Sequence, residues 1–379
     1  MSEWKKVKFL DFIVLQRGFD LTKDSIKDGP YPVVCSTSIM GYHNNYKVEG
    51  PGVVTGRSGT LGETQYVKGN FWPHNTTLFV KDFKGNNRQF VYYFLKNFDI
   101  ASMGGGAAIP SLNRNVLSNL SVTIPDLSIQ NNIATILSRY DSLIENYQKQ
   151  IKLLEEAAQR LYKEWFVDLH FPGHENAKIV DGVPEGWEKK KLADVCDTIG
   201  GGTPSTKVSS YYEGGTISWV TPTDITRNNS LCLLSTEKKI TKEGLNHSSA
   251  KMLPKETILM TSRASVGYFG ICDFEVCTNQ GFISCVPFEK NFQMYLLYNL
   301  MNRVEEIRIK AGGSTYLEIS KSVFRNFDII CPPQSITVNF QCQTHRILEK
   351  TKNISKQIRL LTEARDRLLP KLMSGEIAV

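Results

Sequence analysis

Two apolar heptad seams constrain the fold of this chain more than any other sequence feature. Each seam repeats at alternating spacings of four and three residues, which is typical of long helices that pair side by side. The first seam consists of Ile133, Leu137, Tyr140, Ile144, Tyr147, Ile151, Leu154, Ala158, Leu161 and Trp165. The second seam lies 207 residues further along and consists of Phe340, Thr344, Ile347, Thr351, Ile354, Ile358, Leu361, Arg365, Leu368 and Leu372. The seams predict two helices of about 40 residues, each about 60 Å long at 1.5 Å per residue.

The whole chain has the pattern of a tandem duplication. Trp4 and Trp187 are matching positions at an offset of 183, and Arg57 and Arg263 match at an offset of 206. In the two seams the offset is 207 and no gap interrupts it. The second copy therefore holds about 23 additional residues before Arg263, which we expect around 231–249.

Each copy has a mixed globular part before its long helix. Short β-branched and aromatic runs bounded by turn residues predict strands at 52–55, 77–80 and 257–260, and helical patterns follow near 88–98 and 294–310. Because duplicated units favour two-fold pseudosymmetry, we expect the two long helices to pair with each other in antiparallel orientation. The alternative is that each helix packs only on its own globular part.

The predicted fold class is α+β. Two mixed α/β domains in tandem are separated by two long helices that form an antiparallel coiled coil, with pseudo-two-fold symmetry and the domains at opposite ends. The expected segments are a first domain at 1–125, a central helix at 126–165, a linker at 166–185, a second domain at 186–332, and a C-terminal helix and tail at 333–379.

The charge of the chain is distributed by segment. The formal net charge is +7, from 45 basic and 38 acidic residues. It divides into +5 for 1–125, −4 for 126–185, +2 for 186–332 and +4 for 333–379. Positive globular parts suit contact with phosphate, and opposite charges on the helical segments suit their association.

Composition excludes several classes of protein. No apolar run approaches the length of about 20 residues that a membrane helix needs. The first residues do not resemble a signal peptide, and the eight cysteines lack the spacing of a metal site. We therefore expect a cytoplasmic protein with free thiols.

The sequence offers no catalytic or metal-binding pattern. The glycine-rich run at 199–205 lacks the lysine of a phosphate loop and contains Pro204, and the run at 101–106 lacks the acidic partner of a dinucleotide fingerprint. His170 and His174 have helical spacing, but a Pro-Gly pair between them indicates loop positions and not zinc ligands.

A duplicated set of polar residues forms the candidate binding pattern. Arginine can bond to guanine with two parallel hydrogen bonds and asparagine can do the same to adenine, so loops that carry both are plausible base readers. The candidate DNA-contacting residues are Tyr42, Asn44, Arg57, Ser58, Asn75, Arg263, Ser265, Asn279 and Tyr316. The alternative is that residues shared by both copies brace the loops or contact phosphate, since they cannot specify different bases.

Several longer motifs carry a family resemblance. They are the linker Phe-Val-Asp-Leu-His-Phe-Pro-Gly-His-Glu-Asn at 166–176 that runs on to Trp187, the Gly-Thr-Pro-Ser run at 202–205, the segment Gly-Thr-Ile-Ser-Trp-Val at 215–220, the pair Pro332-Pro333 and the tail at 371–377. Together with the order of the segments, they make essentially the whole chain resemble the specificity subunits of Type I restriction-modification enzymes.

The resemblance implies a function and a set of partners. Each globular part would be a target-recognition domain that reads one half of a split, asymmetric target in double-stranded DNA, and the helices would set the spacer. Two modification subunits would bind the helical region and use S-adenosylmethionine to methylate adenine, while restriction subunits would join through them and use ATP and Mg²⁺. The chain itself would be a non-catalytic subunit that binds no cofactor or metal.

Two details depart from the family pattern. Pro125-Asp126 stands where two prolines are expected, and Gln130 has no counterpart because Thr337 occupies its place. The departures suggest that the two helix starts do not meet a partner in the same way. Two other functions stay open at this stage, namely a single-chain DNA-modifying enzyme and a coiled-coil adaptor without a nucleic-acid role.

Overall fold

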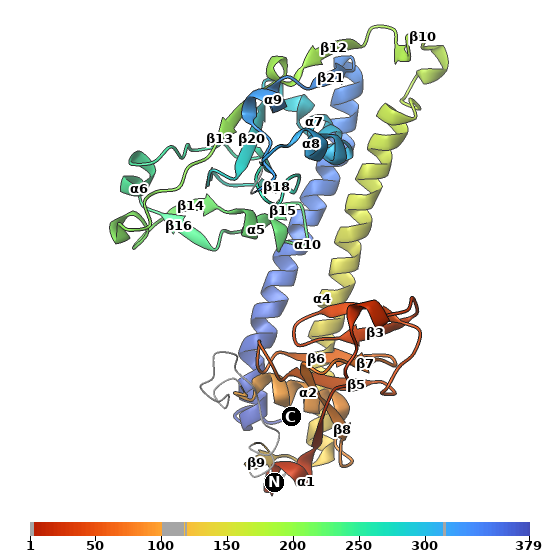
Figure 1. Cartoon of the computed structure of the whole chain (residues 1–379), viewed down its shortest axis with the longest axis vertical. Helices are drawn as coiled ribbons and strands as arrows, with labels where there is room; N and C mark the ends of the chain where they lie inside the picture. Colours follow the sequence, from red (N-terminus) through yellow and green to blue (C-terminus); the bar gives the residue numbers. More distant parts are fainter. Residues whose placement is uncertain (1–3, 101–116, 118–119, 314–315) are drawn as a thin grey trace. The chain divides into compact units, whose positions relative to one another are not determined.

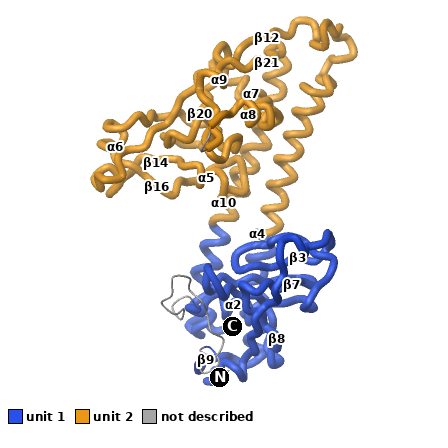
Figure 2. Tube along the Cα trace, viewed as in Figure 1, with its two compact units in different colours: residues 1–144, 360–379 blue, residues 145–359 orange. Residues whose placement is uncertain are grey.

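A computed structural model describes residues 4–100, 117, 120–313 and 316–379 (Figure 1). The chain divides into two compact units, of which unit 1 comprises residues 1–144 and 360–379 and unit 2 comprises residues 145–359 (Figure 2). Each unit thus contains one globular part together with a segment of both long helices. The glycine-rich run at 101–106 lies outside the described residues. No helix in the described part of the chain is long and apolar enough to cross a membrane.

Unit 1 contains a four-stranded sheet in the order β2-β8-β5-β6, a three-stranded sheet in the order β4-β3-β7 and the two-stranded pair β1-β9. Its elements before the long helix are β1 (Lys5–Lys8), α1 (Phe9–Phe12), β2 (Val14–Arg17), the 3-10 turn η1 (Lys23–Ser25), β3 (Tyr31–Val34), β4 (Ile39–His43), β5 (Gly52–Gly56), β6 (Thr64–Val67), β7 (Trp72–Pro73), β8 (Thr77–Asp82), α2 (Arg88–Asn97) and β9 (Ser121–Ile124).

Unit 2 repeats this plan, adds a fifth strand to its larger sheet and contains one further two-stranded pair. Its sheets have the orders β13-β20-β17-β18-β15, β16-β14-β19, β12-β21 and β10-β11. The elements are η4 (His174–Asn176), β10 (Ile179–Val180), β11 (Val183–Pro184), β12 (Glu188–Lys191), η5 (Leu192–Asp194), β13 (Cys196–Gly200), η6 (Ser209–Tyr211), β14 (Ile217–Val220), α5 (Pro222–Thr226), β15 (Cys232–Leu233), β16 (Lys238–Ile240), α6 (Lys242–Asn246), β17 (Ile258–Thr261), β18 (Phe269–Cys272), β19 (Cys277–Thr278), β20 (Phe282–Pro287), η7 (Lys290–Phe292), α7 (Gln293–Asn302), α8 (Val304–Lys310), α9 (Lys321–Arg325) and β21 (Asp328–Cys331).

The strand orders confirm the tandem duplication. The order β2-β8-β5-β6 corresponds strand by strand to β13-β20-β17-β18, and β4-β3-β7 corresponds to β16-β14-β19. The parallel pairing in the smaller sheet also recurs, because β3 pairs in parallel with β7 and β14 with β19. The strands expected at 52–55, 77–80 and 257–260 are present as β5, β8 and β17.

Most of the additional residues of the second copy lie in two connections, of which one begins before the predicted range and the other ends after it. The connection between β3 and β4 spans only 35–38, whereas the matching connection between β14 and β16 spans 221–237. The connection between β4 and β5 spans 44–51, and its counterpart spans 241–257. The first insertion contains α5 and β15, and β15 extends the larger sheet of unit 2 by a fifth strand. The expectation of one insertion around 231–249 was therefore wrong in its extent.

The two long helices are α4 (Leu127–Tyr162), which continues into the π-helical turn η3 (Lys163–Val167), and α10 (Gln334–Ser374). They run antiparallel, since Asp141 of α4 pairs with Arg365 within unit 1, whereas Trp165 contacts Phe340 within unit 2. All seam positions are buried or half-buried. The helix pattern expected at 294–310 is two helices, because α7 ends before Arg303 and α8 begins after it.

Each seam also packs on a globular part, but the alternative that each helix packs only on its own globular part is wrong. In unit 1, Ile133 and Leu137 of α4 share one buried cluster with Phe12, Phe90 and the α10 residue Leu372. In unit 2, the rings of Phe166 and Phe340 lie 5.0 Å apart and those of Phe166 and Tyr295 lie 4.7 Å apart. Aromatic contacts of this kind add to the free energy gained from burial.

A glutamine side chain fastens each globular helix to its long helix. The Oε1 atom of Gln130 accepts the backbone N–H of Asn87 at 3.0 Å in unit 1. In unit 2, Oε1 of Gln341 accepts the backbone N–H of Met294 at 2.9 Å. The structure thus gives Gln130 a functional counterpart one helical turn beyond Thr337, which the constant offset of 207 concealed.

Candidate nucleic-acid interface

In unit 1, the predicted residues Arg57, Ser58 and Asn75 lie in two adjacent loops. The loop after β5 is held by backbone hydrogen bonds from Arg57 and Ser58 to the carbonyl of Thr76, at 2.9 and 3.2 Å. The Arg57 guanidinium donates to the Asn75 carbonyl at 3.4 Å. The buried Ser36 hydroxyl fastens both loops, because it lies 3.1 Å from the Ser58 carbonyl and 2.8 Å from the Thr76 carbonyl. The two loops therefore form one polar surface.

Asp20 belongs to the same surface, although the sequence did not single it out. Its carboxylate accepts a hydrogen bond from the Asn75 side-chain amide. The same carboxylate forms an ion pair with the Arg17 guanidinium at 3.1 Å. The segment that carries Asp20 passes close to the backbone of His74 because Gly18 has no side chain. A Cβ atom at Gly18 would lie 2.1 Å from the His74 carbonyl oxygen.

In unit 2, Arg263 follows β17 and faces an acidic partner. Its Nε atom lies 3.6 Å from the Glu318 carboxylate, and the two side chains are 44% and 47% exposed. The loop is closed by backbone hydrogen bonds from Ala264 to the Leu317 carbonyl and from Ser265 to the Arg263 carbonyl, both 2.8 Å. Tyr316, two residues before Glu318, is exposed. The predicted residues Arg263, Ser265 and Tyr316 thus belong to two chain segments that pair with each other.

Asn279 lies in the adjacent loop, where its side chain stabilises the turn. Its Oδ1 atom accepts the backbone N–H of Gly281 at 2.9 Å, and the Gly281 carbonyl accepts the N–H of Ser262 at 2.8 Å. This second bond connects the Asn279 loop to the Arg263 loop. The Asn279 side-chain oxygen is therefore used within the protein, which favours the bracing alternative for that atom.

Tyr42 and Asn44 lie in another part of unit 1. Tyr42 is in β4 of the three-stranded sheet and is 54% exposed, and Asn44 is an exposed residue just after the strand. Arg57 follows β5, which belongs to the four-stranded sheet. The structure thus assigns the first copy's candidates to two sheets.

The two copies differ in the residue that faces the lysines of their first strand. In β12 of unit 2, Lys189 and Lys191 pair with Asp328 at 3.0 and 2.5 Å. These lysines hold the pKa of the Asp328 carboxyl below its usual value through hydrogen bonds. In unit 1 the strand β1 also carries lysines, but Ser121 stands where Asp328 stands in unit 2. The first copy therefore lacks this neutralising carboxylate, which agrees with its larger net charge.

Comparison with known proteins identifies the fold and its duplication. The sequence profile described as the Type I restriction modification DNA specificity domain matches residues 1–156 and again residues 184–368. The chain belongs to this family.

Individual relatives agree with the family assignment. The specificity subunit of the Type I restriction enzyme MjaIX of Methanocaldococcus jannaschii is 30% identical over 308 residues, which cover 77% of this chain and 69% of the relative. The HindI specificity subunit of Haemophilus influenzae is 27% identical and covers 74% of both chains. The solved S subunit from M. genitalium has the same fold at 18% identity, with a TM-score of 0.61 and coverage of 98% of this chain and 96% of that one.

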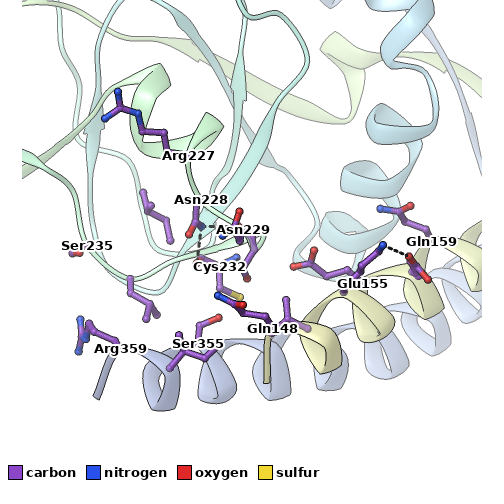
Figure 3. Close-up of a pocket in the computed structure, with 17 residues that line it drawn as sticks. Gln148, Glu155, Gln159, Arg227, Asn228, Asn229, Cys232, Ser235, Ser355 and Arg359 are labelled. Carbon is purple, nitrogen blue, oxygen red and sulfur yellow. Dashed lines mark hydrogen bonds and ion pairs between the residues drawn. The ribbon is translucent and has the colours of Figure 1, made fainter. Parts of the chain in front are cut away.

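The second specificity domain has a cavity that its first insertion builds. A hollow of about 820 Å³ lies between α4, α10 and the segment 227–235 (Figure 3). Glu155 of α4 contacts that segment by accepting the Leu231 backbone N–H at 2.8 Å, and burial raises the pKa of its carboxyl. Burial also raises the pKa of the adjacent Cys232 thiol to about 12. Because the matching connection of the first domain has only residues 35–38, the two domains present different surfaces beside the helices.

Two residues of these specificity-domain loops escaped the sequence analysis, namely Asp20 and Glu318. Each touches a predicted residue from a segment that is remote in sequence, so neither spacing nor composition indicates the contact. One feature of the sequence could have indicated the position of the Asp20 segment. Gly18 and Gly201 match at the offset of 183, and both lie where the chain passes close to the asparagine-bearing loop.

Proposed function

We propose that this chain reads DNA for a Type I restriction-modification complex, with each domain recognising one half of a bipartite, asymmetric target. In this function the polar loops around Arg57 and Arg263 contact DNA, and the antiparallel helices set the spacer between the half-sites. The chain itself is non-catalytic. Residues 42, 44, 58, 75, 265, 279 and 316 complete the proposed contact surface together with these two arginines.

One observation carries the proposal. The same arrangement of strands presents an arginine and an asparagine at equivalent positions in both units, but their neighbours differ. Asn75 bonds to Asp20, whereas Asn279 bonds to the backbone of its own turn and lies next to Gln280, which receives a hydrogen bond from Thr203. A common scaffold with different polar groups at its edge is what two readers of different base sequences require.

The proposal includes partners and their cofactors. Two modification subunits bind along the helices and use S-adenosylmethionine, and restriction subunits join through them and use ATP and Mg²⁺. The site of action is the cytoplasm. The eight cysteines support a reducing compartment, because all of them are free thiols and six are buried.

An exchange of one domain tests the division of labour. Replacement of residues 1–125 by the corresponding residues of another specificity subunit is expected to change one half of the methylated target and to leave the other half unchanged. The measurement is a map of methylated adenines in cells that express the complex. The reciprocal exchange of residues 186–332 is the matched control and should change the other half. A change in both halves after either exchange would contradict the two-reader function.

Single arginine variants test the contacts themselves. If Arg263 bonds a base with both guanidinium nitrogens, Arg263→Gln should weaken DNA binding by about 1–3 kcal/mol, and only for DNA with an intact second half-site. Arg57→Gln should act in the same way on the first half. Binding of the assembled methyltransferase to DNA altered in each half measures this effect. Lys81→Gln is the control, since this exposed lysine lies near the end of β8 that is opposite to the Asn75 loop. Equal weakening for both halves would instead indicate phosphate contact.

A further inference from the structure

Three possible metal ligands converge in unit 2, on segments other than the Arg263 and Asn279 loops. Glu256 lies in the turn before β17, and His345 and Glu349 lie on α10. One ligand atom from each residue lies within 4.8 Å of the others, and all three residues are half-buried. The spacing of four residues places His345 and Glu349 on the same face of the helix, and the turn brings the third ligand to that face.

The backbone of Glu256 is fixed on both sides. Its N–H donates to the Cys272 carbonyl at 2.8 Å, and its carbonyl accepts the side-chain amide of Gln293 at 2.5 Å. Its φ angle is +63°, a left-handed conformation that a residue with a side chain rarely adopts. The turn therefore holds the Glu256 carboxylate beside α10.

An unsatisfied atom of His345 points to a ligand. Its Nδ1 is buried and has no hydrogen-bond partner among the described residues. Buried polar atoms almost always have a partner, and one reason for an exception is an ion that is bound at the site. The neutral imidazole offers this nitrogen as a lone-pair donor to a metal.

Lys352 competes for one of the carboxylates but does not close the site. Its ammonium lies 2.5 Å from Glu349 and also 3.6 Å from Asp273. If Glu349 turns towards a dication, Lys352 keeps Asp273 as its partner. The site then gains a doubly charged ion between two carboxylates without leaving the lysine unpaired.

We propose that Glu256, His345 and Glu349 bind a divalent transition-metal ion, of which zinc is the natural representative. One imidazole and two carboxylates form a ligand set that suits Zn²⁺, and Mg²⁺ prefers oxygen ligands alone. Ligand atoms around tetrahedral zinc are about 3.4 Å apart, so the distances between the ligand atoms shorten by up to about 1.4 Å on binding. The ion joins the turn before β17 to α10 and thereby fastens the second globular part to its helix.

Calorimetric titration of the full chain with zinc chloride tests the site, with Cys342→Ser as the background because Cys342 is an exposed thiol on the same helix. We expect one zinc ion per chain and a rise in melting temperature. His345→Gln and Glu349→Gln should each weaken zinc binding by at least tenfold and remove the rise. Magnesium chloride should have neither effect. Each variant is also melted without zinc, so that a loss of folding is distinguished from a loss of the ligand.

His247→Gln is the matched control, since His247 is an exposed histidine whose Nδ1 already lies 2.9 Å from the Glu243 carbonyl. It should bind zinc like the background protein. The proposal is overturned if no zinc ion binds stoichiometrically. It is equally overturned if folded His345→Gln and Glu349→Gln proteins bind zinc as tightly as the background.

Discussion

Replacement of Asp141 by leucine is expected to lower the free energy of unfolding by about 2–4 kcal/mol, since it breaks a partly buried ion pair between the two long helices. The Asp141 carboxylate lies 2.5 Å from the Arg365 guanidinium, and the two side chains are only 31% and 14% exposed. Asp141 also accepts a hydrogen bond of 2.5 Å from the Tyr93 hydroxyl, whose pKa is raised by burial and by this bond. The single substitution removes the acceptor of the Tyr93 hydroxyl and leaves Arg365 with only Asp366, which lies 2.7 Å away on its own helix.

The second copy supplies the matched double variant. At the offset of 207, Asp141 corresponds to Leu348, and Arg365 corresponds to Ala158. Both of these residues are buried in unit 2. Asp141→Leu with Arg365→Ala therefore gives unit 1 the pair that unit 2 already has. We expect the double variant to recover at least half of the stability that either single variant loses, because no partly buried charge is then left without its partner and Asp366, which also pairs with Arg365, is exposed.

Urea denaturation of the full chain measures these differences. Arg367→Ala is the control on the same helix, because its ion pair with Glu363 is exposed and should contribute no more than about 0.5 kcal/mol. If the single variants unfold like Arg367→Ala, the buried pair has no special role. If the loss of unfolding free energy in the double variant equals the sum of the losses in the two single variants, leucine and alanine do not replace the ion pair.

The ion pair also determines which helix pairs with which. In the same antiparallel register, two copies of α4 from different chains would place Asp141 opposite Ala158. Two copies of α10 would place Arg365 opposite Leu348. Each of these pairings buries a charge without the partner that the other helix provides, and only Arg365 keeps a second carboxylate, Asp366, on its own helix. The pair therefore favours association of α4 with α10 over association of either helix with itself.

The helices were the most predictable part of the fold, whereas their register was not. Heptad spacing depends only on residues near in sequence, so it located both seams and their ends to within a few residues. Arg365 interrupts the apolar pattern of the second seam, and the pattern alone gives it no partner. Its partner Asp141 lies one residue outside the first seam, and only the register of an antiparallel pair brings them together.

The candidate interface was predictable where the duplication repeated it. The loops of Arg57 and Arg263 could be found because both copies retain an arginine after an equivalent strand. The side chains that surround these arginines differ between the copies and come from remote segments, as Glu318 does for Arg263. No repeat or periodicity marks such contacts. For the same reason, the sequence did not reveal that the insertion begins at residue 221.

Replacement of Gly201 by alanine is expected to destabilise unit 2 about as much as Asp141→Leu destabilises unit 1. An added Cβ atom would lie 2.1 Å from the Asn279 carbonyl oxygen and 2.3 Å from the Thr278 carbonyl oxygen. Both neighbours are backbone atoms, so the 201 segment and the Asn279 loop would have to move apart. The cost should be about 3 kcal/mol, at the upper end for overpacking. Because Asn279 lies in the proposed reading surface, recognition of the second half-site should fall by at least tenfold.

Gly200→Ala is the control from the adjacent residue, since a Cβ atom there meets no atom within 4 Å. It should change the unfolding free energy by less than about 0.5 kcal/mol and leave DNA binding unchanged. Urea denaturation and binding to DNA altered in each half measure both effects. Gly18→Ala should act on the first half-site alone, because its Cβ atom would meet the His74 carbonyl of unit 1. If Gly201→Ala behaves like Gly200→Ala, the close approach of these loops is not needed for recognition, and the reading surface must lie elsewhere in the domain.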